Sequence, residues 1–75
     1  MEELLGKYQH YKGNFYEVIG IARFSENPSQ EFVVYRALYK SPEFGENQLW
    51  IRLRAMFFEE VLINGVKVPR FKKVK

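Results

Sequence analysis

Alternation of hydrophobic and polar residues divides the chain into short extended segments. The pattern predicts strands at residues 7–12, 15–24, 31–40 and 48–54, because each run is rich in β-branched and aromatic residues. Residues 25–30 and 41–47 carry proline, asparagine and glycine, and we expect loops there. Gly20 lies in mid-strand, where glycine indicates a bulge or a bend. The third strand is apolar on both faces, which predicts a central position in the sheet.

Residues that favour tight turns predict hairpin connections between several of the strands. Residues 12–14 read Lys-Gly-Asn, between the first two strands. Asn64-Gly65 separates residues 61–63 from 66–68 and predicts a two-residue type I′ hairpin, and Pro69 limits its second strand to an edge or an end. Residues 55–60 have room for one helical or 3₁₀ turn, and residues 1–5 for a frayed turn or half a helix. The sequence thus predicts a mainly β fold, a small SH3-like, partly open barrel of five or six short strands with one helical or 3₁₀ turn.

The fourth strand carries the clearest alternation. We expect Leu49, Ile51 and Leu53 to face the core, while Gln48, Trp50, Arg52 and Arg54 face outward. On this assignment Ile51→Ala would cost about 2–5 kcal/mol of stability.

Length, composition and charge predict the number of domains and the position of a basic segment. The 75 residues predict one domain (1–75), with no cysteine and with 17% aromatic residues to supply buried area. Residues 1–66 hold seven basic and nine acidic side chains, whereas residues 67–75 hold five basic ones, so we expect a basic C-terminal tail at residues 69–75.

No signal peptide or membrane-length apolar run is present, and we expect a cytoplasmic protein. Both a monomer and a homodimer fit a chain this short.

Candidate catalytic and metal chemistry is sparse. The sequence has no Gly-x-Gly pair, one histidine and no aspartate, so we predict no metal site and no cofactor. An enzyme would have to use His10 with Glu17 or Glu26, and we consider a non-enzymatic role more consistent with one histidine in so small a domain.

Aromatic and arginine residues make a binding face the leading functional hypothesis. Trp50 and Arg52 share one strand face, and an aromatic beside guanidinium groups suits a base or another anionic ring. We expect ligand contacts from residues of this character: Tyr8, His10, Tyr35, Trp50, Arg52 and Arg70. The ligand would be nucleic acid or nucleotide-like. A protein or peptide partner uses the same aromatics without a basic surface, so that alternative stays open, as does an assembly subunit. The alternative for His10 and Trp50 is a structural role, with His10 bonded to a backbone carbonyl and Trp50 under the N-terminal segment or the tail.

One family has a similar pattern of residues. Its opening motif, Gly-x-Tyr-x-His-Tyr-Lys-Gly, is matched at residues 6–13; Tyr16-Glu17-Val18, Trp50-x-Arg52 and Pro69-Arg70-Phe71 follow. The chain resembles the bacterial family known as domain of unknown function 1653 over nearly its whole length. Phe24 and Leu53 stand where that family usually has histidine and proline. The resemblance implies a small β domain and implies no activity.

Overall fold

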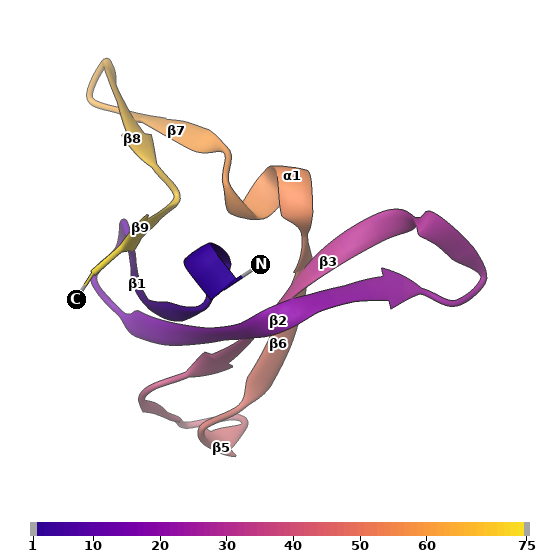
Figure 1. Cartoon of the computed structure of the whole chain (residues 1–75). Coiled ribbons are helices and arrows are strands. Elements are labelled where there is room, and N and C mark those ends of the chain that lie inside the picture. The colour runs from indigo at the N-terminus through magenta and orange to yellow at the C-terminus, as the bar shows by residue number, and fades with distance from the viewer. Residues whose placement is uncertain (1, 75) are drawn as a thin grey trace.

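An open five-stranded antiparallel sheet forms the centre of the structure, a computed structural model that describes residues 2–74. Its strand order is β6-β3-β2-β1-β9 (Figure 1). The strands are β1 (Gly6–His10), β2 (Phe15–Phe24), β3 (Asn27–Ala37), β6 (Leu49–Leu53) and β9 (Phe71–Lys73). The sheet bends without closing, so the predicted mainly β, partly open fold is confirmed.

Shorter elements flank this sheet. β4 (Lys40–Ser41) pairs with β5 (Gly45–Glu46), and β7 (Glu60–Ile63) pairs with β8 (Val66–Pro69). The 3₁₀ helix η1 (Glu2–Leu4) begins the described chain, and the one-turn helix α1 (Arg54–Phe57) follows β6. The expected N-terminal turn included Met1, which lies outside the described residues. Within residues 2–74 no helix has the length and apolarity that crossing a membrane requires.

The Asn64-Gly65 turn confirms the predicted hairpin. Both residues have positive φ angles, 50° and 79°, as a type I′ turn requires. Residues on the two sides then pair in register, with Ile63 opposite Val66 and Val61 opposite Val68. The hairpin forms because its turn is specified by two adjacent residues.

A bulge in β2 changes which side chains reach the core. The pairing of β2 with β3 shifts register between Val18 and Gly20, as the mid-strand glycine predicted. One extra residue inverts the alternation beyond it. Ile21 therefore packs against the buried cluster, opposite Val33.

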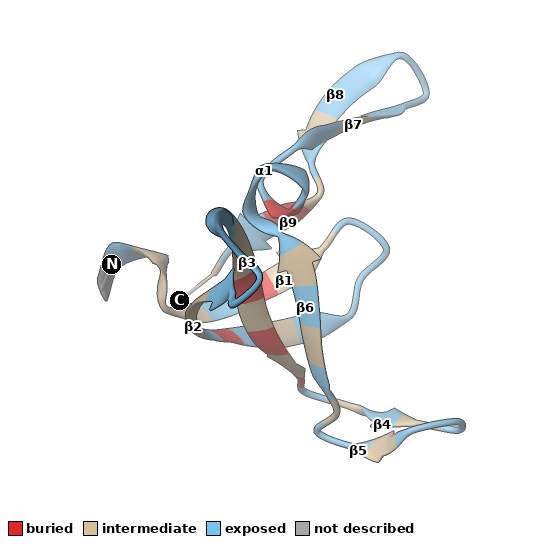
Figure 2. Cartoon of the chain, turned by 90° about the vertical axis from the view of Figure 1, so that its right-hand side faces the viewer, coloured by how far each residue is buried: buried red, intermediate tan, exposed pale blue. Residues whose placement is uncertain are grey.

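Aromatic rings fill the concave side of the sheet. Phe57 of α1 and Phe71 of β9 stack with centroids 4.0 Å apart and an interplanar angle of 4°. Tyr8 meets Phe57 edge-on, and Tyr35 meets both phenylalanines edge-on. Figure 2 shows buried segments on β2 and β3 and beside α1 and β9, around this interior. We call the concave side the inner face and the opposite side the outer face.

The predicted orientation of β6 is wrong. Ile51 is 62% exposed and Leu49 49%, whereas Trp50 and Arg52 are half-buried on the inner face. Trp50 lies opposite Tyr35 in the register, so both side chains point to the same side. The aromatic inner face fills the core, and the aliphatic row of β6 remains outside.

Element boundaries differ from the prediction in two further places. β3 begins at Asn27, because the β2–β3 hairpin continues through most of the predicted loop. Phe71, placed by the sequence in a trailing basic segment, is 4% exposed and belongs to β9, which pairs with β1. That pairing joins distant parts of the chain, which local patterns do not reveal.

Truncating a side chain in the aromatic core should lower the free energy of unfolding much more than truncating one in the exposed aliphatic row of β6. Phe57→Ala should lower the free energy of unfolding by about 3–5 kcal/mol, because the ring is fully buried and stacked. Ile51→Ala should cost far less than that, since its side chain is mostly in solvent. Urea denaturation of both variants measures the difference; similar losses would contradict this description of the core.

Candidate functional site

Polar and charged atoms gather at one end of the aromatic inner face. His10 on β1 and Tyr35 on β3 both meet the Phe71 ring edge-on, at centroid distances of 4.9 and 5.4 Å. The Arg52 guanidinium lies over the same ring at 5.7 Å. Tyr16 and Tyr39 complete this group, which we call the inner-face cluster: His10, Tyr16, Tyr35, Tyr39 and Arg52.

Arg52 differs from the other arginines in its polar partners. Arg23, Arg36, Arg54 and Arg70 each form an ion pair with a glutamate. Arg52 donates from Nε to the Tyr35 hydroxyl at 3.4 Å, and no carboxylate of the described chain lies within 4.0 Å of its guanidinium. It is half-buried opposite Val33. A half-buried guanidinium without a counter-charge attracts anions.

Two tyrosines beside Arg52 hydrogen-bond to each other. The hydroxyl oxygens of Tyr16 and Tyr39 are 2.8 Å apart, and either group can donate. Burial, and then the hydrogen bond to Tyr39, raise the pKa of Tyr16. The Tyr16 hydroxyl therefore stays protonated near neutral pH and acts as a hydrogen-bonding group.

His10 is oriented by its own turn. Its Nδ1 accepts a hydrogen bond from the Lys12 amide at 3.1 Å, which places the proton of the neutral ring on Nε2. Burial lowers the pKa of His10, and the charges of Arg52, Lys12 and Arg70 lower it further. The ring is thus a neutral donor in a positively charged environment near neutral pH.

The other predicted site residues have structural contacts. Tyr8 and Tyr35 are 4% and 5% exposed, and the Tyr8 hydroxyl donates to the Leu4 carbonyl at 3.0 Å. Trp50 is half-buried and meets Phe44 edge-on at 5.2 Å. Arg70 donates to the Met56 carbonyl and to Glu59, at 3.1 and 2.8 Å. The structure therefore brings His10, Tyr35 and Arg52 together and places Tyr8 and Arg70 at the border with α1.

Three residues of this region were not singled out from the sequence. Tyr16 lies opposite Tyr8 in the register, so the first hairpin could have placed both on one face. Phe71 comes to this region through the pairing of β9 with β1, and Tyr39 through the path of the chain after β3. The sequence offers no local signal for either placement.

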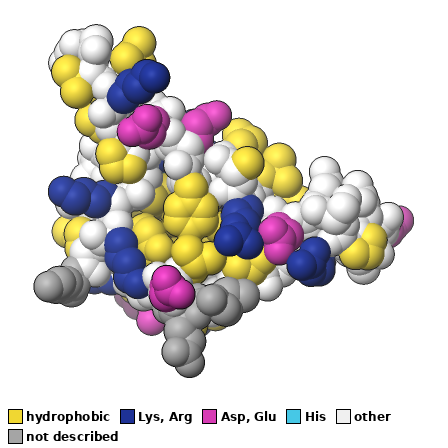
Figure 3. All heavy atoms as spheres, turned by 45° about the horizontal axis from the view of Figure 1, so that its top comes forward, with side chains coloured by type: hydrophobic (Ala, Val, Ile, Leu, Met, Phe, Trp, Pro, Cys, Tyr) yellow, Lys and Arg dark blue, Asp and Glu magenta, His cyan; other side chains and the backbone are white. Residues whose placement is uncertain are grey.

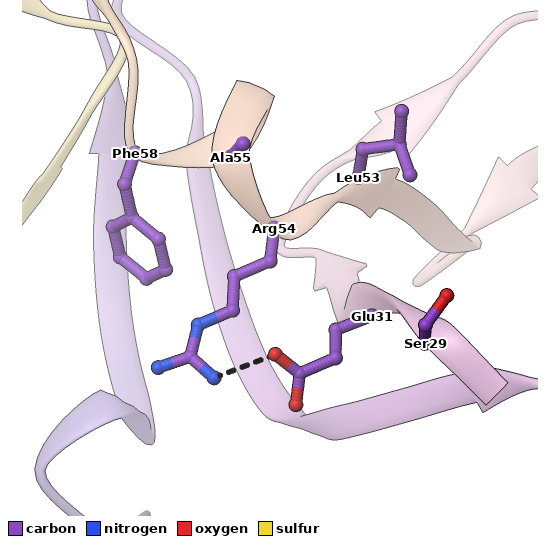
Figure 4. Close-up of a pocket in the computed structure, with 6 residues that line it drawn as sticks. All are labelled: Ser29, Glu31, Leu53, Arg54, Ala55 and Phe58. Atoms are coloured by element: carbon purple, nitrogen blue, oxygen red, sulfur yellow. Dashed lines mark hydrogen bonds and ion pairs between the residues drawn. The ribbon is translucent and has the colours of Figure 1, made fainter.

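Open clefts lie both away from the cluster and next to it. One, of about 520 Å³, contains Arg54 and Glu31, whose side chains point toward each other with Phe58 to one side (Figure 4). Glu31 also pairs with Arg23, so both arginines here share one carboxylate. The other, of about 410 Å³, lies between β1 and the β7–β8 hairpin and is lined by His10, Tyr11 and Lys72 among others. It brings solvent to His10.

The glutamates considered for an enzyme do not meet His10. Glu17 accepts from Arg36 at 3.2 Å and is opposite Lys7 in the register, on the outer face. Glu26 lies in the turn between β2 and β3, at the far end of that hairpin. Among residues 2–74 there is also no group of three side chains suited to hold a metal ion.

These observations define a small, open antiparallel β domain with an aromatic core and a charged cluster on its concave face. The sequence matches the family model described as protein of unknown function (DUF1653) over residues 6–73, and the chain belongs to this family. A crystal structure of a DUF1653 protein from Bordetella bronchiseptica is similar, with a TM-score of 0.81 and 34% identity. The similarity covers 93% of this chain and 85% of that one. Comparison with curated proteins finds no significant match.

The environment of His10 predicts a specific pH response. Its imidazole should titrate below the ordinary value of 6.5, because burial and three cations disfavour the charged ring. A depressed histidine pKa contributes stability that is complete above 6.5 and is lost as the pH falls through that value toward the folded pKa. NMR titration measures the midpoint. Arg52→Gln should raise it, whereas Arg36→Gln on the outer face should not, and a wild-type midpoint at or above 6.5 would contradict the assignment.

Proposed function

We propose that the domain is a binding module for a nucleotide-like ligand or a short single-stranded nucleic acid, held at the inner-face cluster. The guanidinium of Arg52 carries this proposal, because it has no carboxylate partner in the described part of the chain, whereas each of the other arginines has one. Arginine binds phosphate through two parallel hydrogen bonds, and its Nη groups are the natural donors here. The Nε2–H of His10 and the two tyrosine hydroxyls provide further groups for hydrogen bonds.

Exposed aromatics next to His10 and next to Trp50 suit the base of such a ligand. Tyr11 stacks in a tilted arrangement on His10 at 4.5 Å and is 38% exposed, and Phe44 beside Trp50 is 52% exposed. A base stacked on an aromatic ring gains about 1–3 kcal/mol. Tyr8 and Tyr35 are too buried to stack on a ligand, so their contribution would be to shape the site.

Charge distribution favours a small ligand over a long nucleic acid. Residues 1–66 carry two more acidic than basic side chains. Figure 3 shows one face, on which basic side chains stand apart from each other and hydrophobic side chains gather between them. Nucleic-acid domains that follow a long backbone present a continuous basic surface. We therefore expect one or two phosphate contacts.

Arg52→Gln tests the proposal. Titration with AMP, ATP, inorganic phosphate and a short oligouridine should shift the NMR signals of His10, Tyr39 and Arg52. Loss of a charge-assisted hydrogen bond costs about 1.5–3 kcal/mol, so Arg52→Gln should weaken binding by roughly tenfold or more. It should also reduce the slope of log affinity against log salt concentration by about 1.

Arg36→Gln is the matched control, because Arg36 is paired with Glu17 on the outer face. Its affinity should equal that of the wild type. Trp50→Ala is less informative alone, since this residue also packs against the core, so its melting temperature must be read beside its affinity. The absence of shifts with all four ligands, or equal losses in Arg52→Gln and Arg36→Gln, would refute the proposal.

A further inference from the structure

Strand β6 is an unpaired edge of the main sheet. It pairs with β3 on one side, and no described strand pairs with the other. Figure 2 shows it running between α1 and the β4–β5 hairpin. Unpaired strand edges readily accept another strand, and natural proteins usually protect them with charges, prolines or covering segments.

The backbone groups at this edge can be assigned from the register. Ala37 donates its amide to the Gln48 carbonyl at 2.9 Å, so this pair and every second pair after it bond within the sheet. Leu49, Ile51 and Leu53 fall in the alternate positions. Their amides therefore point away from β3, as does the Ile51 carbonyl.

The same three residues carry exposed aliphatic side chains. Leu49, Ile51 and Leu53 are 49%, 62% and 36% exposed on the outer face. An apolar cleft of about 300 Å³ adjoins Ile51 and is lined also by Phe24 and Phe32. The edge thus combines unpaired backbone groups with an uncovered apolar row, which is the combination that strand addition uses.

The sequence of β6 is symmetric in the way that a twofold interface requires. Leu49-Trp50-Ile51-Arg52-Leu53 has the same apolar row in both directions about Ile51. Antiparallel pairing of two copies about Ile51 places Leu49 of one opposite Leu53 of the other. It also places Trp50 opposite Arg52 on the inner face, a favourable cation–π combination, and sets no like charges opposite each other within the strand.

We propose that β6 is a homodimer interface, in which two copies of this chain pair their β6 strands antiparallel about Ile51 and extend the sheet across a twofold axis. Such an interface is isologous, with each copy presenting the same residues. This inference rests on the backbone edge and the outer aliphatic row of β6 and does not depend on ligand binding, although Trp50 and Arg52 of the same strand border the proposed ligand site. Stable interfaces bury about 1,200–2,000 Å² in total, and a five-residue strand pair covers less, so we expect a reversible dimer.

Sedimentation velocity over protein concentrations of about 10 μM to 1 mM measures the association. The mass should rise from that of the 9.0 kDa chain toward twice that value. Ile51→Lys should weaken dimerisation at least tenfold, because it sets two ammonium groups opposite each other at the axis. Leu62→Lys is the matched control: Leu62 is 67% exposed on the β7–β8 hairpin, and dimerisation should be unchanged.

Cross-linking tests the register independently of any effect of the lysine on folding. The chain has no cysteine, so Ile51→Cys introduces one thiol. Its Cα atoms would be about 5.5 Å apart across the axis, within disulfide range, and mild oxidation should give a covalent dimer. Leu62→Cys should not. A wild-type monomer at all concentrations, a dimer unaffected by Ile51→Lys, or equal cross-linking of the two cysteine variants would overturn the proposal.

Discussion

The stacked pair of Phe57 and Phe71 is the contact on which the fold depends. Neither ring belongs to the long strands β2 and β3: one comes from the single turn of α1, the other from the last strand, β9. Their burial brings both segments onto the concave side of a sheet that would otherwise expose Tyr8 and Tyr35. A chain of 75 residues has few side chains for a core, and large rings fill that volume with the fewest residues.

Filling a core with tyrosines also creates the candidate site. Each buried tyrosine carries a hydroxyl that needs a partner, and in this fold the partners are Leu4, Tyr39 and Arg52. Arg52 can lie half-buried because Phe71 and the Tyr35 hydroxyl take the place of some of its water. Among the side chains that the structure describes, the glutamates in ion pairs are bound to other arginines, and none is paired with Arg52. The cluster is thus charged as a consequence of how the core is built.

Features specified by neighbouring residues were predictable from the sequence, and those set by distant contacts were not. The Asn64-Gly65 hairpin and the Gly20 bulge follow from local backbone preferences, and both are present. The orientation of β6 was wrong because alternation identifies two faces without saying which is buried; hydrophobicity favoured the Ile51 side, whereas aromatic packing decided for Trp50. Phe71 joined the core only through pairing with β1. For the site, Arg52 and His10 were identifiable by residue type, but the lack of a carboxylate beside Arg52 required the tertiary structure.

The two faces of β6 connect the two proposals. Its inner side chains, Trp50 and Arg52, border the candidate ligand site, and its outer row forms the candidate dimer edge. In the proposed antiparallel register Trp50 of one copy would lie opposite Arg52 of the other, so pairing would change the surroundings of both ligand sites at once. A ligand that favours the paired arrangement of Arg52 must, by thermodynamic reciprocity, strengthen dimerisation by the same factor. Strand β6, which the sequence analysis assigned to core packing, would then link self-association to ligand binding. A five-residue edge is too small to hold a dimer tightly by itself, so the dimer equilibrium would respond to the ligand.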